Sequence, residues 1–329
     1  MGDCLRRQER DTELGTNIRI AERMSPDPTE EELDYFRRMG IEAASIWTTQ
    51  DRATLEYMTS LKKRLASWNI ELWNIGVLDL HCDPDMVLGL EGFPQKVEQY
   101  KEYLRNLGLA GINYTTYAHM ANIKMPQYYQ TGLGEVRGLP TREFDLKEAR
   151  NLPLSHERKY SEQEVWKTMI EFIREVVPVA EEAGVRIGLH PDDPPLAGLG
   201  GVGRVARSYA HCEQLIDLAD SDFFGLCLCV GSWAAGGETM GTDVYETIDL
   251  FGREGKLFKV HFRNVDSSLP VFRETLVDDG YIDMSKVMQA LKEVEFDGAI
   301  LPDHVPGGDA EAAYTIGYMR ALRNQVCGL

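Results

Sequence analysis

The stretch SEQEVWKTMIEFIREVVPVAEEAGVRIGLH, residues 161–190, holds the structural unit that decides the fold. It opens as Ser161-x-x-Glu164, the capping-box pattern of a helix N-terminus, and an amphipathic pattern continues from there to a glycine stop. Pro178 lies inside this pattern, so we expect a kink in the helix. A short apolar run follows and ends on His190. The stretch therefore predicts one amphipathic helix followed directly by one buried strand.

The same alternation of helix and strand patterns extends along the whole chain of 329 residues. Seven further apolar, β-rich runs lie at 18–24, 42–48, 72–80, 111–118, 224–230, 257–262 and 298–301. Eight strands that are each followed by a helix, with no obvious linker, predict a single (β/α)8 TIM barrel over residues 1–329. A doubly wound sheet with a second domain is the alternative, because alternation alone does not prove that the sheet closes.

One long segment, about 120–160, has no regular pattern and is too long for an ordinary connection. It contains Tyr128, Tyr129 and Phe144, and its Lys and Arg outnumber its Asp and Glu although the net charge of the chain is −18. Aromatic and cationic side chains give such a segment groups with which to pack and bind. We expect an insertion after the fourth strand that forms a lid over the mouth of the barrel.

Composition limits the partners and the location of the protein. With 43% hydrophobic residues the chain can build a sizeable core, yet no run approaches the roughly 18 apolar residues of a membrane helix. A net charge of −18 repels nucleic acid and acidic membranes, so neither is expected as a partner. The polar N-terminus carries no export signal, and the six cysteines are scattered along the chain. We therefore expect reduced thiols and a cytoplasmic location.

Metal-binding side chains stand at the carboxyl ends of four consecutive strands, the end at which barrel active sites form. These side chains are His190, Cys229, His261 and Asp303. A single buried histidine or cysteine is more often part of the core, but four such groups at equivalent depths favour a metal site over a polar network without metal. Two imidazoles, a thiolate and a carboxylate suit a first-row divalent ion, and the set does not choose among Zn, Mn, Fe, Co and Ni.

The run GLCLCVGSW, residues 225–233, places two cysteines two residues apart. Side chains alternate along a strand, so Cys227 and Cys229 share a face and are separated by roughly 6.6 Å along it. Because the chemistry lies at the carboxyl end, only Cys229 reaches the metal. We expect Cys227 to lie one layer deeper as small core filler.

Three further features flank the predicted metal ligands. In HPDDPP, residues 190–195, Asp192 or Asp193 is expected to orient a ligand histidine, and at least one of the two has a turn role. Arg263 shares a strand face with His261 and is expected to hold a substrate carboxylate, with a surface ion pair as the alternative. The segment GLGGVG, 198–203, matches a dinucleotide motif but begins eight residues after the strand-end histidine, which favours a mobile glycine loop.

At these stretches the chain resembles the mannonate dehydratase family, metal-dependent TIM barrels of the xylose-isomerase-like superfamily. The matching stretches are HPDDPP at 190–195, CVGS at 229–232, HFRN at 261–264, FRETLVDDGYIDMSKVMQAL at 272–291, PDH at 302–304 and GYMRAL at 317–322. The resemblance is good from about residue 185 onward and moderate at 100–114. It implies the same four metal ligands, manganese as the metal, and a homo-oligomer.

The resemblance also implies a reaction and an acid/base pair. The family removes water from a sugar acid by taking the C2 proton and releasing the C3 hydroxyl, which leads to a 2-keto-3-deoxy acid. His304 and Tyr318 are the implied pair, in which either residue can be the acid and the other the base. D-Mannonate, converted to 2-keto-3-deoxy-D-gluconate, is the leading substrate.

The N-terminal half departs from the family pattern, with IRIAERM, LDLHCDPD and NYTTYAHMAN at 18–24, 78–85 and 113–122. His81 stands near the family's histidine and Tyr117, or else Tyr114, near its tyrosine, so His81 and Tyr117 are expected to bind substrate. Two other functions stay open: a metal-dependent isomerase or epimerase of a neutral sugar, and a non-catalytic sugar-binding barrel.

Overall fold

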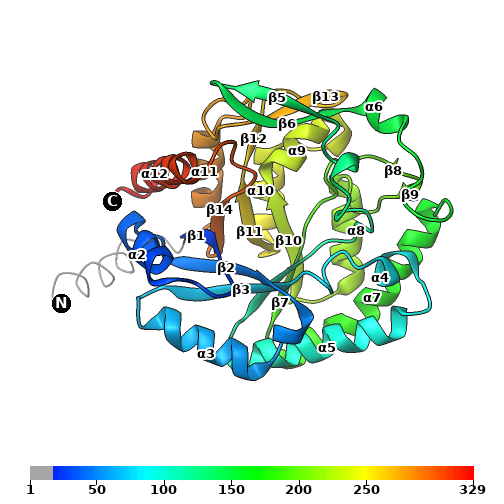
Figure 1. Ribbon diagram of the computed structural model, residues 1–329, viewed down its shortest axis with the longest axis horizontal. Helices are drawn as coiled ribbons and strands as arrows, with labels where there is room; N and C mark the ends of the chain where they lie inside the picture. The colour runs from blue at the N-terminus through cyan, green and yellow to red at the C-terminus, as the bar shows by residue number, and fades with distance from the viewer. Residues whose placement is uncertain (1–17) are drawn as a thin grey trace.

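The computed structural model describes residues 18–329 and forms a ring of eight parallel strands surrounded by helices (Figure 1). The strands are β1 (Arg19–Met24), β2 (Ala43–Thr48), β3 (Glu71–Val77), β4 (Tyr114–Tyr117), β7 (Arg186–Leu189), β10 (Phe224–Cys229), β11 (Leu257–Phe262) and β14 (Ala299–Pro302). Each overlaps one of the eight predicted runs. Residues 1–17, on which the expectation of no export signal depends, lie outside the described residues.

The strand order confirms a barrel over a doubly wound sheet. Parallel ladders run in the order β3-β2-β1-β14-β11-β10-β7-β4, so β1 pairs with β14 and joins the two ends of the chain. The strands at the two ends of this order, β3 and β4, contact each other without a ladder. The Thr115 hydroxyl donates to the Ile75 carbonyl across this seam at 3.1 Å, so the barrel is nearly closed.

Helices on the outside bury the apolar outer face of the strands. They are α2 (Glu30–Met39), α3 (Leu55–Ala66), α4 (Pro84–Leu88), α5 (Phe93–Ala110), α6 (Leu146–Arg150), α7 (Glu162–Ala183), α8 (Tyr209–Ala219), α9 (Val230–Gly236), α10 (Val244–Arg253), α11 (Met284–Glu293) and α12 (Asp309–Cys327). The predicted capping box is present in α7: the Ser161 hydroxyl accepts from the Glu164 backbone N–H, and the Glu164 carboxylate accepts from the Ser161 backbone N–H. This helix continues through Pro178 to Ala183. None of the helices within 18–329 combines the length and the apolar character needed to cross a membrane.

The segment 120–160 is more regular than the sequence indicated, which corrects the expectation of an irregular segment. It forms a hairpin of β5 (Gly132–Val136) and β6 (Leu139–Asp145), preceded by the short helix η2 (Pro126–Tyr128). The turn residues Arg137 and Gly138 both have positive φ, 49° and 81°, as a two-residue hairpin turn of the mirror-image type requires.

This hairpin is tied to the chain that follows β11. Strand β6 pairs with β13 (Val271–Thr275), and β13 pairs with β12 (Asn264–Val265), which gives a four-stranded antiparallel sheet. Phe144 of β6 stacks on Phe272 of β13 with ring centroids 5.5 Å apart. The insertion therefore holds a fixed position beside the carboxyl ends of β11 and β14, and a lid motion stays a prediction.

The glycine-rich segment 198–203 forms a small hairpin, with β8 (Gly198–Leu199) paired to β9 (Val202–Gly203). Gly200 and Gly201 occupy the turn with φ of 59° and 82°, a backbone conformation that glycine adopts without steric cost. A hairpin turn replaces the glycine loop expected from the sequence, and it does not have the strand-to-helix geometry of a dinucleotide site.

Candidate metal centre

Three of the predicted ligands meet at the carboxyl ends of neighbouring strands. His190 directly follows β7, Cys229 is the last residue of β10, and His261 lies near the end of β11. Cys229 is the registered partner of His261 in the parallel ladder. One possible donor atom from each of the three residues lies within 4.8 Å of those of the others.

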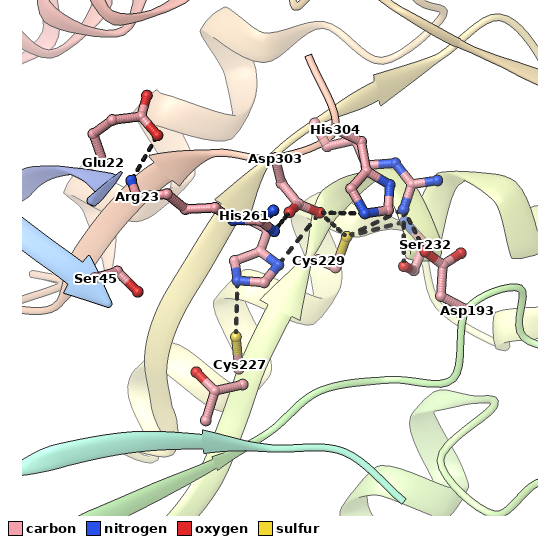
Figure 2. Close-up of polar contacts among 12 residues, drawn as sticks. Glu22, Arg23, Ser45, Asp193, Cys227, Cys229, Ser232, His261, Asp303 and His304 are labelled. Atoms are coloured by element: carbon pink, nitrogen blue, oxygen red, sulfur yellow. Dashed lines mark hydrogen bonds and ion pairs between the residues drawn. The ribbon is translucent and has the colours of Figure 1, made fainter. Parts of the chain in front are cut away.

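Asp303, which follows β14, completes the set. Its Oδ2 lies 3.5 Å from His261 Nδ1 and 3.9 Å from Cys229 Sγ, and Figure 2 shows the carboxylate between these residues and His304. Its Oδ1 accepts from Arg23 Nη2 at 2.5 Å. Burial opposes the charged form, but the charges of His304, His261 and Arg23 hold the pKa of Asp303 well below its usual range. The four side chains thus lie together, with the carboxylate ionised.

The electrostatics of Cys229 favour the form of sulfur that binds metal. Burial raises the pKa of its thiol, but hydrogen bonds with His190 and His261 and the charge of Arg263 lower it to about 5. The backbone N–H of Ser232, in the first turn of α9, also points at Cys229 Sγ at 3.4 Å. At neutral pH the sulfur is therefore a thiolate.

The surroundings of His261 give a further reason to expect a divalent ion among these residues. Within residues 18–329, the buried Nδ1 of His261 makes no hydrogen bond; its ion-pair contact is Asp303 Oδ2 at 3.5 Å, on the side where Cys229 also lies. An unsatisfied buried imidazole nitrogen costs free energy, which a bound cation would offset. Nitrogen, thiolate and carboxylate donors converging on one point are the chemistry of a transition-metal site.

Cys227 is more than the core filler that the sequence predicted. Its Sγ lies 3.7 Å from Nε2 of His261, the ring nitrogen opposite to the one that faces Asp303 (Figure 2). A partner on the second ring nitrogen fixes the orientation and the tautomer of a ligand histidine. Cys227 therefore supports His261 through its Nε2, on the side of the ring away from Asp303.

We expect Cys227→Ala to weaken the affinity for a divalent ion by about tenfold, because His261 loses the partner of its Nε2. Isothermal titration of the metal-free protein with Mn²⁺ or Zn²⁺ measures this affinity. Cys212→Ala is the matched control, since Cys212 is also buried but lies on α8, outside the cluster. Equal affinities for the two variants would contradict the supporting role of Cys227.

The place of Arg263 does not support the expected substrate clamp. Its guanidinium is buried and already paired twice, with Asp193 Oδ2 at 2.6 Å and Glu274 Oε1 at 2.8 Å. Its Nη1 also lies 3.8 Å from Cys229 Sγ. Arg263 therefore has no free donor fork for a substrate carboxylate, and its charge instead stabilises the thiolate.

The two aspartates of HPDDPP do not hydrogen-bond to the ligand histidines. Asp193 pairs with Arg263, and Asp192 accepts from Arg204 Nη1 at 3.2 Å and from the Ala206 backbone N–H at 2.8 Å. His190 instead has its Nδ1 2.6 Å from the Pro191 carbonyl oxygen. The backbone, and not an aspartate, thus orients the His190 ring.

His304 stands at the edge of the cluster. Its Nε2 lies 3.9 Å from Asp303 Oδ2, and its Nδ1 lies 2.7 Å from Glu274 Oε1. Arg142, from β6 of the insertion, has its Nη1 3.3 Å from the same ring. Sequence reasoning missed both Glu274 and Arg142. The signals were present, since Glu274 lies inside the stretch FRET and Arg142 belongs to the basic insertion.

His81, which the sequence predicted to bind substrate, lies near the cluster. The His81 ring contacts Trp47 at 4.6 Å, and burial together with the charge of His190 lowers the pKa of His81 to about 3. His81 is therefore a neutral imidazole close to a predicted ligand. Its Nδ1 has no hydrogen-bond partner within residues 18–329.

Among the contacts described for residues 18–329, Tyr117 and Tyr318 do not touch the predicted ligands, although the Tyr117 ring lies edge-on to the His81 ring at 6.4 Å. The Tyr117 hydroxyl is buried 2.7 Å from His119 Nδ1, and its ring stacks on Phe172 of α7, so the side chain lies between the barrel and its helices. Tyr318, on α12, lines a surface pocket with Asp278 and Tyr281. Among the contacts described for residues 18–329, none joins Tyr318 to His304.

The fold and the cluster together define the class: a (β/α)8 barrel with converging metal-type donors at the carboxyl ends of its strands. The D-mannonate dehydratase family model matches residues 130–326. The mannonate dehydratase of Thermotoga neapolitana is 29% identical over 304 residues, 82% of each chain, and that of Streptococcus pneumoniae is 29% identical over 275 residues, 76% of this chain and 74% of the relative.

Solved structures agree on the fold. The crystal structure of mannonate dehydratase from Streptococcus suis matches with a TM-score of 0.81 at 24% identity, covering 94% of this chain and 95% of that one. A xylose isomerase domain protein from Planctomyces limnophilus matches with a TM-score of 0.65 at 11% identity, covering 95% and 99%. The chain belongs to the D-mannonate dehydratase family, which confirms the resemblance and the expected enzyme class, a hydro-lyase.

Proposed function

We propose that this protein is a metal-dependent dehydratase that removes water from a sugar acid, with D-mannonate as the leading substrate and 2-keto-3-deoxy-D-gluconate as the product. The observation that carries the proposal is the adjacency of a proton-transfer group and a ligand set: His304 lies beside Asp303 in the cluster with His261 and Cys229. Relatives of this chain in Thermotoga and Streptococcus carry the name mannonate dehydratase.

In this proposal His190, Cys229, His261 and Asp303 hold a divalent ion. Manganese is favoured by the family resemblance, and the donor set also suits Fe, Co, Ni and Zn. When bound, the ion supplies Lewis-acid stabilisation of negative charge on the substrate oxygens. The buried Nδ1 of His261, which makes no hydrogen bond within residues 18–329, and the lowered pKa of the Cys229 thiol support this assignment.

The reaction breaks the C2–H and C3–O bonds and forms a C2=C3 double bond, and the enol then becomes the 2-keto acid. One of His304 and Tyr318 takes the C2 proton and the other donates a proton to the departing hydroxyl. His304 already stands at the cluster. Tyr318 lies on α12, and its part in the pair rests on the family resemblance.

A substrate carboxylate needs a cation with a free donor fork, and we assign this role to Arg142 instead of Arg263. Arg142 is partly exposed, and its one ion pair described within residues 18–329 is a long one of 4.0 Å with Glu274. Its guanidinium also lies over the Tyr129 ring and touches the His304 ring. A guanidinium beside the proton-transfer group would orient the carboxylate bidentately.

We expect Arg142→Gln to raise the KM for the sugar acid by about 10- to 100-fold, because a charge-assisted hydrogen bond to the carboxylate is lost. Steady-state kinetics over a range of aldonate concentrations measure the change. Arg137→Gln is the control from the same hairpin, since Arg137 lies at the turn and pairs with Asp278 and Asp279. An unchanged KM in Arg142→Gln would refute the assignment.

The function itself is tested by incubating the metal-loaded protein with a panel of aldonic acids and neutral sugars. A 2-keto-3-deoxy acid formed from D-mannonate supports the proposal. Interconversion of neutral sugars would instead identify an isomerase or epimerase, and sugar binding without turnover would identify a binding barrel. The homo-oligomer and the cytoplasmic location stay predictions.

A further inference from the structure

We infer that Glu274 is a positioning residue that holds His304 in the orientation and tautomer needed for proton transfer. The inference rests on the proposed function, because it deepens the role given there to His304. The Glu274 carboxylate is buried and is not among the residues predicted from the sequence.

The first observation is that one oxygen of a buried carboxylate serves two partners. Glu274 Oε1 lies 2.7 Å from His304 Nδ1 and 2.8 Å from Arg263 Nη2, and Glu274 is only 5% exposed. A buried carboxylate is costly unless it is paired and hydrogen-bonded, and Arg263 supplies the opposite charge that pairs with it. The Glu274 side chain is therefore a fixed acceptor.

The backbone of Glu274 is also held in place. Strand β13 pairs Glu274 with Val265 of β12 on one side, and the Glu274 carbonyl accepts from the Thr141 hydroxyl of β6 at 2.8 Å on the other. The insertion hairpin and the chain after β11 thus both anchor the carboxylate. A group anchored on strands holds a partner more precisely than a group on a free loop.

The second observation is the backbone of His304. Its φ is +49°, in the left-handed region that residues other than glycine seldom occupy. Such a conformation is strained and persists only where the surroundings hold it. The hydrogen bond to Glu274 is one such constraint, and it joins the strained residue to the antiparallel sheet.

The third observation is the direction in which the ring points. An ionised carboxylate can only accept, so His304 Nδ1 carries the proton of the Glu274 bond. Nε2 is then the acceptor nitrogen, 3.3 Å from Arg142 Nη1 and 3.9 Å from Asp303 Oδ2. The same logic, in which a carboxylate fixes the tautomer of a catalytic histidine, operates in Ser-His-Asp triads.

The competing role for Glu274 is neutralisation of Arg263 alone. Asp193 provides a matched comparison, because its Oδ2 pairs with the same guanidinium at 2.6 Å and contacts Arg263 from the other side. Removing either carboxylate disturbs Arg263, but only the loss of Glu274 frees the His304 ring.

The experiment compares Glu274→Gln with Asp193→Asn in the metal-loaded, full-length protein. For Glu274→Gln we expect kcat to fall about 10²-fold with KM changed less than about twofold and an unchanged metal content per chain. We expect a much smaller fall in kcat for Asp193→Asn. Equal losses of kcat in the two variants, or a kcat kept by Glu274→Gln, would overturn the inference.

A second measurement separates this inference from the proposed function. ¹H–¹⁵N correlation spectra of the histidine rings in zinc-loaded protein report the tautomer without any turnover. The Nδ1–H form of His304 is expected in the native chain and its loss in Glu274→Ala. If the native protein does not dehydrate the aldonates, the proposed function fails, while the tautomer comparison still decides the role of Glu274. An identical His304 tautomer in both proteins would sink that role.

Discussion

Replacing Cys229 by serine is expected to abolish tight metal binding. The change removes the thiolate at the point where imidazole and carboxylate donors converge, and a serine hydroxyl stays protonated at neutral pH and is a poor ligand. We expect the affinity to fall by more than about 100-fold, beyond the effect of losing a supporting residue. Metal analysis of the purified variant and chelator competition measure the loss.

Cys227→Ser is the control for this prediction, because Cys227 lies on the same strand and touches only the far nitrogen of His261. A milder loss is expected for it. Charge-transfer absorption of the cobalt-substituted protein adds a direct readout of a sulfur ligand. Metal lost in Cys227→Ser and kept in Cys229→Ser would reverse the assignment of the two cysteines.

The second large effect is expected from His304→Asn, which should lower kcat by about 10²- to 10⁴-fold, the usual contribution of a positioned acid or base. Asparagine tolerates the left-handed backbone that His304 adopts, so the variant keeps the local fold. Product formation from the sugar acid and metal content are measured on the same sample.

His156→Asn gives the matched control, because His156 lies in the insertion with its Nδ1 2.9 Å from the Ser155 hydroxyl, away from the cluster. The rate should fall only in His304→Asn, and both variants should keep their metal. A normal rate in His304→Asn would remove His304 from the chemistry, whereas loss of metal there would give it a different role.

The barrel could be predicted from local patterns, and so could the meeting of the four proposed ligands at one end of it. A buried strand such as β10 shows as an apolar run, and the carboxyl ends of parallel strands meet at one end of the barrel. His190 and Asp303 can therefore meet in space although they lie far apart along the chain. Once their strands are neighbours in a ring, the last side chain of each comes near the others.

The partners of Arg263 could not be predicted, because they come from unrelated segments. Asp193 belongs to the turn after β7, and Glu274 belongs to an antiparallel strand whose neighbours are the insertion and β12. No local pattern pairs β6 with β13. The sequence therefore predicted a guanidinium available for substrate, whereas the fold places two carboxylates against it.

Whether Tyr114 or Tyr117 faces the inside of the barrel depends on the phase of the strand. Side chains on a strand alternate between the two faces, so a correct strand with an unknown phase leaves each residue on either side. Tyr114 packs on Trp73, and Lys259 of β11 lies over its ring, whereas Tyr117 stacks on α7. The run at 111–118 has tyrosines on both phases, and only the fold decides which one faces inward.

The dependence of the reaction on the metal centre is tested most directly by a titration. Protein stripped with a chelator is supplied with increasing Mn²⁺ in the presence of D-mannonate, and the initial rate of 2-keto-3-deoxy acid formation is followed. The rate is predicted to start near zero and to rise until one ion is bound per chain. Full turnover by the stripped protein, or no product with one ion bound per chain, would contradict a metal-dependent mannonate dehydratase.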